Sequence, residues 1–442
     1  MRGLIVFVAV ICAMPVAFVS PFFGMMFYNW FALMKPEWLY GFPRSIPVAM
    51  LVAICTFLGW LFSKERKLPP IDATFVLVLL LLFWMTVTTY FSVAQDFAWT
   101  RYKEVSKIML FALVMYALLT SPKRIQIALW VLSICVAFWG AKGGFASLLR
   151  GGGFRVFGPA HSVIEDNNNL GVALVTVTPL LFACRAMCTR AWQRHGMSIF
   201  IALTLVGTVF TYSRGAMLGA AAMASMAWLR SQRKALGAIT AVVLVGLFLQ
   251  LAPQSVFDRF NTIQTYAQDG SAQDRIYLWE LNWRAALDRP IIGQGFNWMF
   301  NRQAANKVAA EANLHEIPPN LGVAHSIYFE VLGEHGFVGF ALYFSLVTVV
   351  LMNALWLRRH APSGKEDEWA SHLGRMIPAA IVGYLVSGAF DSVSTYEGYY
   401  QLFIIVAAAK SIVRASAKAT QVTAAPVAAP AYAMPTLPRG QV

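Results

Sequence analysis

Apolar runs about 20 residues long recur along most of the chain, and short basic clusters separate them. A helix needs about 20 mostly apolar residues to cross a bilayer. By this rule the sequence predicts eleven crossings after residue 44, near 45–63, 72–91, 105–120, 125–148, 167–187, 197–213, 215–229, 234–251, 326–357, 374–392 and 397–413. Only 13% of the residues are charged, whereas soluble domains carry about 25%. We therefore expect an all-α polytopic membrane protein.

The basic clusters alternate with the expected crossings so that they all fall on one face of the membrane. Lysine and arginine accumulate on the cytoplasmic side of membrane proteins, which makes this face the cytoplasm. Because many of the cations behind the net charge of +14 lie in these clusters, the charge does not indicate nucleic-acid binding. The clusters are Lys64/Arg66/Lys67, Lys123/Arg124, Arg185/Arg190/Arg194, Arg230/Arg233/Lys234, Arg358/Arg359 and Lys410/Arg414.

Residues 1–44 supply one further net crossing if Met1 is cytoplasmic, which brings the expected total to about 12. Pro15, Ser20 and Pro21 interrupt this region, as in a span followed by a re-entrant or interfacial segment. Arg2 before an apolar run also resembles a signal peptide. We favour an uncleaved anchor, because twelve crossings then place both termini in the cytoplasm.

The stretch from Leu251 to Ser326 is the one long hydrophilic insertion, and we expect its core, residues 252–325, to form a large, partly helical periplasmic loop. Loops positioned by a rigid scaffold are where binding and catalytic residues concentrate. Within it, DRIYLWELNWRAALDRP places Arg275, Trp279 and Trp283 at helical spacing, which predicts an amphipathic helix near the bilayer surface. The cations of the loop suit an anionic, lipid-linked substrate.

Three residues on the expected outer face stand out. Arg214 lies in a tight turn between two crossings, where a guanidinium either anchors the chain at the interface or clamps a phosphate. Arg275 lies one turn before Trp279 and is a second candidate for phosphate binding. His325 directly precedes an apolar run and is either a hydrogen-bonded structural residue or a general base.

Metal chemistry finds little support in the sequence. The carboxylates of the outer face are scattered, so we expect no metal site and no cofactor. The five cysteines lie in apolar runs or in a short basic loop, and no disulfide framework or zinc-like spacing follows from them.

The order of these motifs resembles the O-antigen ligase/polymerase family of bacterial inner membranes. The residues that carry the resemblance are Gly158-Pro159, Asp166-Asn167-Asn168, Ser213-Arg214-Gly215, Arg275…Trp279…Pro290-Ile-Ile-Gly293-Gln-Gly295, Ala324-His325-Ser326 and Leu332-Gly333-Glu334-His335-Gly336. The segment PFFGMMFYNWFALMKPEWLYGF also looks like the amino-terminal region of a subgroup described as O-glycosylation ligases.

The resemblance implies a lipid-phosphosugar-dependent glycosyltransferase, an inverting and metal-independent enzyme of the inner membrane with its site facing the periplasm. It would move an O-antigen-type glycan from undecaprenyl diphosphate to lipid A-core oligosaccharide, among membrane lipids. His325 would act as general base, and Arg214 and Arg275 would bind the diphosphate and stabilise its developing charge. Arg289 is assigned to substrate binding, and Asp391 would orient His325 or bind the acceptor sugar.

Three alternatives remain open at this stage. An O-antigen polymerase or a protein O-oligosaccharyltransferase would use the same donor with another acceptor, and a lipid-glycan flippase would carry no transfer chemistry. For all of these functions we divide the chain into an amino-terminal transmembrane region (1–150), a catalytic membrane region (151–414) and a tail (415–442). The tail is rich in Ala and Pro, which predicts disorder on the cytoplasmic side.

Overall fold

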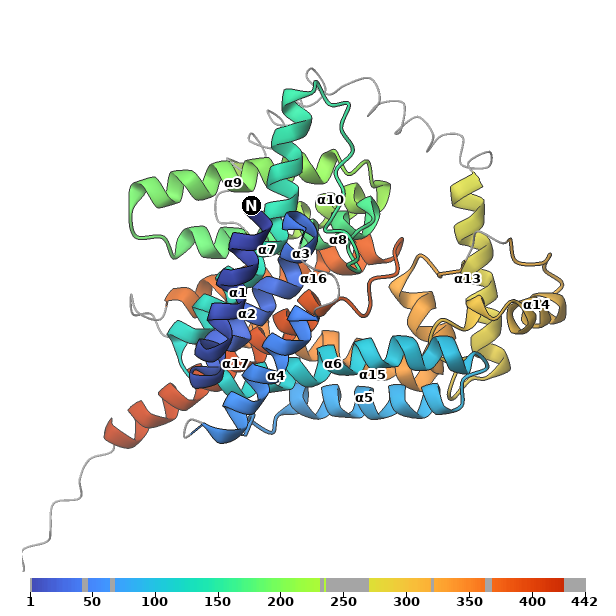
Figure 1. Ribbon diagram of the computed structural model, residues 1–442, viewed down its shortest axis with the longest axis horizontal. Coiled ribbons are helices and arrows are strands. Elements are labelled where there is room, and N and C mark those ends of the chain that lie inside the picture. The colour runs from blue at the N-terminus through green and yellow to red at the C-terminus, as the bar shows by residue number, and fades with distance from the viewer. Residues whose placement is uncertain are drawn as a thin grey trace, which may run out of the picture.

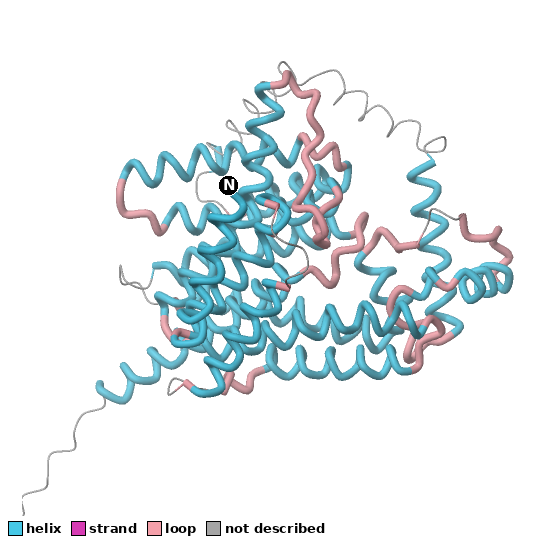
Figure 2. The backbone as a smooth tube through the Cα atoms, viewed as in Figure 1, coloured by secondary structure: helices cyan, strands magenta, loops and turns pink. Residues whose placement is uncertain are grey.

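The computed structural model describes residues 2–41, 47–63, 68–230, 234–235, 270–318, 322–361 and 368–424. Within these ranges the chain forms helices and loops and no strand, so the predicted all-α fold is confirmed (Figures 1 and 2). The helices are α1 (Arg2–Val19), α2 (Pro21–Met34), α3 (Pro36–Tyr40), α4 (Val48–Phe62), α5 (Ala73–Tyr90), α6 (Gln95–Leu118), α7 (Pro122–Leu149), α8 (Asn167–Ala186), α9 (Ala191–Val209), α10 (Arg214–Leu229), α13 (Gly270–Asp288), η2 (Trp298–Phe300), α14 (Arg302–Glu311), α15 (Ile327–His360), α16 (Glu368–Gly388) and α17 (Glu397–Ala424).

Five described helices are long and apolar enough to cross a membrane, namely α5, α7, α8, α15 and the part of α17 up to Ala417. Two shorter apolar helices, Gly3–Val19 and Val48–Phe62, accompany them. The chain therefore has the character of a multi-pass membrane protein. The total of twelve crossings and the periplasmic position of residues 252–325 stay predictions, and most of the crossing expected at 234–251 lies outside the described residues.

Helix α8 is the centre of the bundle. It packs against α7, α9, α10 and α16. In its apolar stretch 78% of the residues are buried, compared with 33% in that of α5. A helix that is hydrophobic on all sides is buried on all sides in this way. Because α8 begins at Asn167 and is enclosed along its length, the loop before it is held at one end of the bundle.

Small residues allow the central helices to approach closely. A Cβ atom built on Gly207 of α9 would lie 2.0 Å from the carbonyl oxygen of Gly140 in α7. On the other side of α8, a Cβ atom on Gly219 of α10 would lie 2.9 Å from the carbonyl oxygen of Gly383 in α16. Such contacts are how membrane helices associate without a hydrophobic driving force between them.

The amino-terminal helices join the bundle through α2. Helices α1, α2 and α4 pack on one another, and α2 also contacts α6 and α7. Pro15 lies inside α1, so the expected interruption occurs only at Ser20, before the proline that opens α2. Pro is tolerated there because the first turn of a helix leaves its N–H groups unpaired.

The inserted loop contains helices, as predicted. Helix α13 covers the segment expected to be helical and runs across the direction of α5, α6 and α15 at one end of the molecule, next to α14 (Figure 1). Tyr277, Leu278 and Leu281 of α13 bury their side chains against residues of η2 and α14. Two expected loop boundaries differ from the structure, because α6 already begins at Gln95 and α17 continues to Ala424.

Candidate functional site

The loop after α13 is fixed to a kink in α15. Gly336 interrupts α15 with φ 66° and ψ −172°, a conformation that is essentially restricted to glycine. The N–H of Phe337 donates to the carbonyl of Pro290 at 2.8 Å, and the N–H of Gly295 donates to the carbonyl of Glu334 at 2.8 Å. Gly293 lies so close that a Cβ atom there would be 2.6 Å from the nitrogen of Gly336. The two glycine motifs of the sequence therefore form one backbone joint, which orients α13.

Arg214 begins α10 in a turn that contacts the loop between α16 and α17. Ser213 caps α10 by accepting the N–H of Ala216 at 3.2 Å. A Cβ atom on Gly215 would lie 2.9 Å from that of Phe390. The tight turn predicted around Arg214 is thus present, and it lies directly against the residue that precedes Asp391.

His325 and Asp391 are paired. The Nδ1 atom of His325 lies 3.8 Å from Oδ1 of Asp391, and the side chains are 38% and 3% exposed. His325 has a positive φ of 47°, which is uncommon for a residue with a side chain and is typical of functional sites. One face of the imidazole is thereby open, while the carboxylate behind it is withdrawn from solvent.

The charges around Asp391 identify its neighbours. Burial raises the pKa of the Asp391 carboxyl above its ordinary value, and the hydrogen bond and charge of His325 and the charge of Arg275 partly oppose this. Asp166 raises the pKa further by like-charge repulsion. Asp166 itself caps α8 by accepting the N–H of Asn168 at 2.8 Å. Four ionisable groups from four separate segments therefore meet at one end of α8.

Arg275 approaches the site from α13 beside an aromatic contact. One turn further along, the ring of Trp279 stacks on Phe329 with centroids 5.5 Å apart and tilts toward Phe390 at 6.1 Å. The Nε atom of Arg275 and the Nε1 atom of Trp279 are buried and have no hydrogen-bond partner among the described residues. A buried donor without a partner is unfavourable, and an anionic or hydroxyl-bearing ligand would supply the acceptor.

Arg289 is separated from this cluster. It follows the end of α13, and at about 1.5 Å rise per residue it lies roughly 21 Å along the helix from Arg275. Its N–H and carbonyl continue the helical bonding to Ala285 and Gly293. Of the five predicted site residues, the structure thus gathers Arg214, Arg275, His325 and Asp391 and leaves Arg289 apart. A role for Arg289 in substrate binding stays a prediction.

Residues 199–344 match the O-antigen ligase family. The match covers about a third of the chain and supports a relation to that family. The matched segment contains both arginines and His325 of the cluster, whereas Asp391 lies beyond its end. Residues 1–188 match a second family, which is of unknown function. No curated protein matches the chain.

A cavity of about 650 Å³ with several charged lining residues adjoins this cluster. Val323 and Ser392, close in sequence to His325 and Asp391, line it together with Arg101, Glu330 and Glu334. Sequence analysis gave no role to these last three residues. The two glutamates lie one helical turn apart just after His325, and this spacing is the sequence signal that could have identified them. Arg101 comes from a distant segment and has no such signal.

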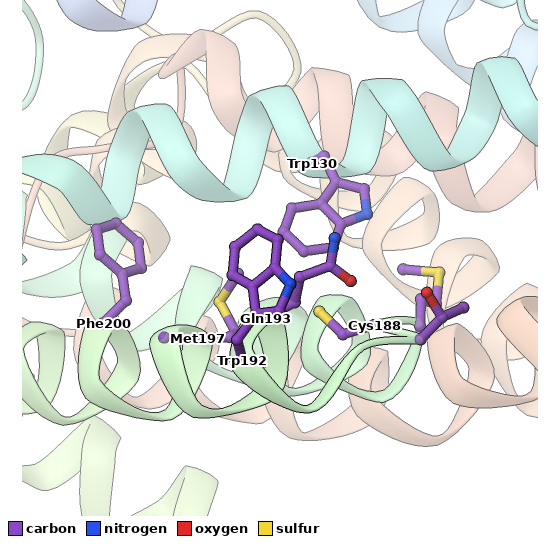
Figure 3. A pocket seen from close by; sticks show the side chains of 9 residues that line it. Trp130, Cys188, Trp192, Gln193, Met197 and Phe200 are labelled. Carbon is purple, nitrogen blue, oxygen red and sulfur yellow. The ribbon is translucent and has the colours of Figure 1, made fainter.

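A second pocket lies at the other end of α8. It has a volume of about 530 Å³, and its lining includes Trp130, Cys188 and Trp192 (Figure 3). Since α8 has 20 residues, this pocket is roughly 30 Å from Asp166. Its lining among the described residues includes no carboxylate and no cationic side chain. In the described part of the chain no three His, Cys, Asp or Glu residues form a group that could hold a metal ion.

Proposed function

We propose that the protein transfers an O-antigen-type glycan from undecaprenyl diphosphate to lipid A-core oligosaccharide, at the periplasmic face of the bacterial inner membrane. The observation that carries the proposal is the pair of His325 and Asp391, 3.8 Å apart, beside Arg275 and the turn that begins with Arg214. The match to the O-antigen ligase family supports ligase or polymerase chemistry, and an imidazole beside two arginines supports the roles of base and phosphate-binding cations.

The proposed reaction is a single displacement. The half-exposed imidazole of His325 accepts the proton of an acceptor hydroxyl, whose oxygen attacks the anomeric carbon of the lipid-linked glycan. The bond from that carbon to the diphosphate oxygen breaks, and undecaprenyl diphosphate leaves with the electron pair. Attack from the side opposite the leaving group inverts the anomeric centre, and the proton on His325 later passes to water.

Asp391 assists His325 in this scheme without contacting the substrate. Its carboxylate faces the imidazole at 3.8 Å, where a negative charge stabilises the imidazolium that forms during the reaction. The carboxylate is buried, so solvent screens this interaction weakly. Asp391 is therefore a positioning residue for the base.

The two arginines act on the leaving group. Breaking the sugar–oxygen bond concentrates negative charge on the diphosphate, and cations fixed in advance bind that transition state more tightly than the substrate. A guanidinium presents a planar fork that matches phosphate oxygens. The Nε of Arg275 has no hydrogen-bond partner in the described part of the chain, and Arg214 lies at the start of α10. Both features suit this role, which requires no metal ion.

The test is reconstitution of the purified full chain in lipid nanodiscs with undecaprenyl-diphosphate glycan. Lipid A-core, a second lipid-linked glycan and a protein acceptor are offered separately, and the products are separated by mass. A glycan joined to lipid A-core with inverted anomeric configuration is the expected product. Product on the second lipid-linked glycan would indicate a polymerase, and product on protein an O-oligosaccharyltransferase. Movement of the donor from one leaflet to the other in vesicles that contain the protein, without a new glycosidic bond, would indicate a flippase.

A further inference from the structure

We propose that the cavity beside His325 binds the acceptor saccharide, and that the amino-terminal region builds the wall that selects it, with Arg101 as a specificity-determining residue. The inference rests on the proposed transfer reaction. It assigns a role to residues 1–188, whose family match carries no function.

The cavity lies between the two family segments. One wall comes from the amino-terminal region and includes Tyr28, Lys35 and Arg101. The opposite wall comes from the ligase-family segment, with Glu330 and Glu334 one turn apart on α15. Neither segment encloses the cavity alone, so a ligand inside it contacts both.

The cavity lies beside the two segments that carry the proposed base and its partner. Its lining includes Val323, two residues before His325, and Ser392, the residue after Asp391. In an inverting displacement the nucleophile and the leaving group lie on opposite sides of the anomeric carbon. The base must be within hydrogen-bond reach of the attacking hydroxyl. This cavity, whose lining includes neither Arg275 nor Arg214, is therefore the acceptor side.

The charges of the lining favour a neutral, hydroxyl-rich ligand. Four glutamates and three cationic side chains line the cavity, so it has no excess of positive charge. Carboxylates repel a diphosphate but accept hydrogen bonds from sugar hydroxyls, and guanidinium groups donate them. The rings of Tyr28 and Phe300 add apolar surface, and the volume falls in the usual range for small-ligand sites. These properties favour binding of a saccharide and disfavour binding of the diphosphate leaving group.

Arg101 connects the amino-terminal wall to the turn between α16 and α17. Its Nη1 atom donates to Oε2 of Glu104 at 2.8 Å, and its Nη2 atom donates to the hydroxyl of Thr395 at 2.5 Å. Its charge also acts on the carboxylates of Glu330 and Glu334. The side chain is 24% exposed, so part of the guanidinium remains accessible from the cavity. Arg101 thus holds the acidic groups in a fixed pattern and keeps donors for a ligand.

The remaining amino-terminal contribution is fixed by ring stacking. Trp38 of α3 stacks on His161 with ring centroids 3.7 Å apart, and His161, Ser162 and Val163 line the cavity. The short helix α3 is therefore in direct contact with the loop that leads to Asp166. A change of sequence in α2 and α3 would alter the wall of the cavity without altering the base or the two arginines.

Steady-state kinetics of the reconstituted full chain test the role of Arg101, using whichever acceptor the parent protein glycosylates. Arg101→Gln should raise the KM for the acceptor about tenfold, because a charge-assisted hydrogen bond is lost. The KM for undecaprenyl-diphosphate glycan should stay within about twofold. Arg101→Lys should recover part of the effect. Lys103→Gln is the matched control, since Lys103 lies exposed on the same helix and does not line the cavity.

Other outcomes contradict the assignment. A rise in donor KM without a change in acceptor KM would mean that the cavity holds the donor glycan. If Thr395→Val, which removes one hydrogen bond of Arg101, reproduced every effect of Arg101→Gln on kcat and on both KM values, Arg101 would only support the turn that carries Asp391. A parent protein that forms no glycosidic product at all would overturn the proposed function instead.

Photocrosslinking tests occupancy of the cavity without requiring turnover. Phe300, which lines it, is replaced by p-benzoylphenylalanine in the full chain, and the protein is irradiated in living cells. We expect a saccharide-bearing adduct by mass spectrometry, in lower yield when Arg101→Gln is added and in unchanged yield with Lys103→Gln. Adducts that contain only phospholipid would show that the cavity is a lipid site and would overturn the inference.

Discussion

The Nδ1 atom of His325 lies 3.8 Å from the Oδ1 atom of Asp391, which connects the start of α15 to the turn between α16 and α17. The match to the O-antigen ligase family ends at residue 344, so the base lies inside the matched segment and its partner outside it. The proposed site is therefore assembled only when α16 and α17 have packed onto the rest of the bundle.

Replacing His325 removes the proposed general base. His325→Ala should insert and fold but lose at least about 100-fold in transfer rate, because positioned bases contribute about 10²–10⁴-fold. The measurement is initial rate in nanodiscs, with size-exclusion chromatography to verify folding. His315→Ala is the control: His315 lies exposed in the same loop and stacks on Tyr277, and its loss should leave the rate near that of the parent. Near-normal turnover by His325→Ala would assign the base elsewhere.

Removing metal ions should leave the reaction intact. The scheme uses a base and two arginines for the tasks that metal-dependent transferases give to a divalent cation. Transfer by the parent protein should therefore continue after exhaustive chelation. The measurement is the amount of glycan product formed over time. Loss of activity that Mg²⁺ or Mn²⁺ restores would contradict the metal-free mechanism.

The two arginines should each contribute to the transition state. Arg214→Ala and Arg275→Ala should each lose about 2 kcal/mol or more of transition-state stabilisation, since hydrogen bonds to charged groups are of this size. The loss is measured as kcat/KM for the donor. Arg284→Ala serves as control, because Arg284 is on the same helix, exposed, and paired with Glu280 at 2.6 Å. An arginine whose loss changes the rate no more than this control is only an anchor.

Much of the fold could be predicted because lipid requires long apolar helices. The boundaries of α8 and α10 follow the apolar runs within a residue or two, and the spacing of Arg275 and Trp279 predicted α13. The position of Arg289 was also within reach, since α13 is a rigid helix between it and Arg275. The positive charge of Arg289 in a polar loop suggested that it shares a site with Arg275, but the rise of the helix separates the two residues.

Tertiary contacts account for what the sequence did not indicate. Arg101 and Thr395 are far apart in the chain, and neither carries a local pattern that predicts their hydrogen bond. Pro290, Gly293 and Gly336 were noted as parts of motifs, but their joint is a backbone contact between two segments. The resemblance suggested that Asp391 orients His325 or binds the acceptor sugar; the two side chains lie close together, and either role stays a prediction.

The orientation of the chain is a separate prediction from its basic clusters. A cysteine introduced at Gly270, at the start of α13, should react with a membrane-impermeant maleimide added outside spheroplasts. The control is a cysteine introduced at Gln193, next to the cluster expected in the cytoplasm, which should react only after the membrane is permeabilised. The reverse pattern of labelling would refute the orientation.

The joint at Gly336 should be intolerant of any side chain. Gly336→Ala would place a Cβ atom 2.3 Å from the carbonyl oxygen of Ile291 and would strain a φ of 66°. Strain of this kind costs about 1–3 kcal/mol even before the clash is counted, so the midpoint of thermal unfolding should fall clearly. Gly196→Ala is the control, since a Cβ atom on Gly196 in α9 meets open space and alanine favours helix. Equal midpoints for the two variants would contradict the importance of the joint.

Asp391 should reduce stability while it supports activity. Because burial raises the pKa of its carboxyl, the folded protein binds the proton of the neutral form more tightly than the unfolded chain does. The stability that this form contributes is fully present below the ordinary pKa of aspartate and is lost as the pH rises through the raised pKa. Asp391→Asn should thus unfold at the same or a higher temperature than the parent at neutral pH, and this difference should vanish in acid.

The activity of Asp391→Asn should change in the opposite direction. Without the negative charge beside His325, the imidazolium is less stable, so transfer should fall by about tenfold or more. The rate and the temperature of unfolding are measured in one pH series, with Asp288→Asn as the control, because Asp288 is exposed at the end of α13. If Asp391→Asn lowered both stability and activity at neutral pH, Asp391 would be a structural residue and not the partner of the base.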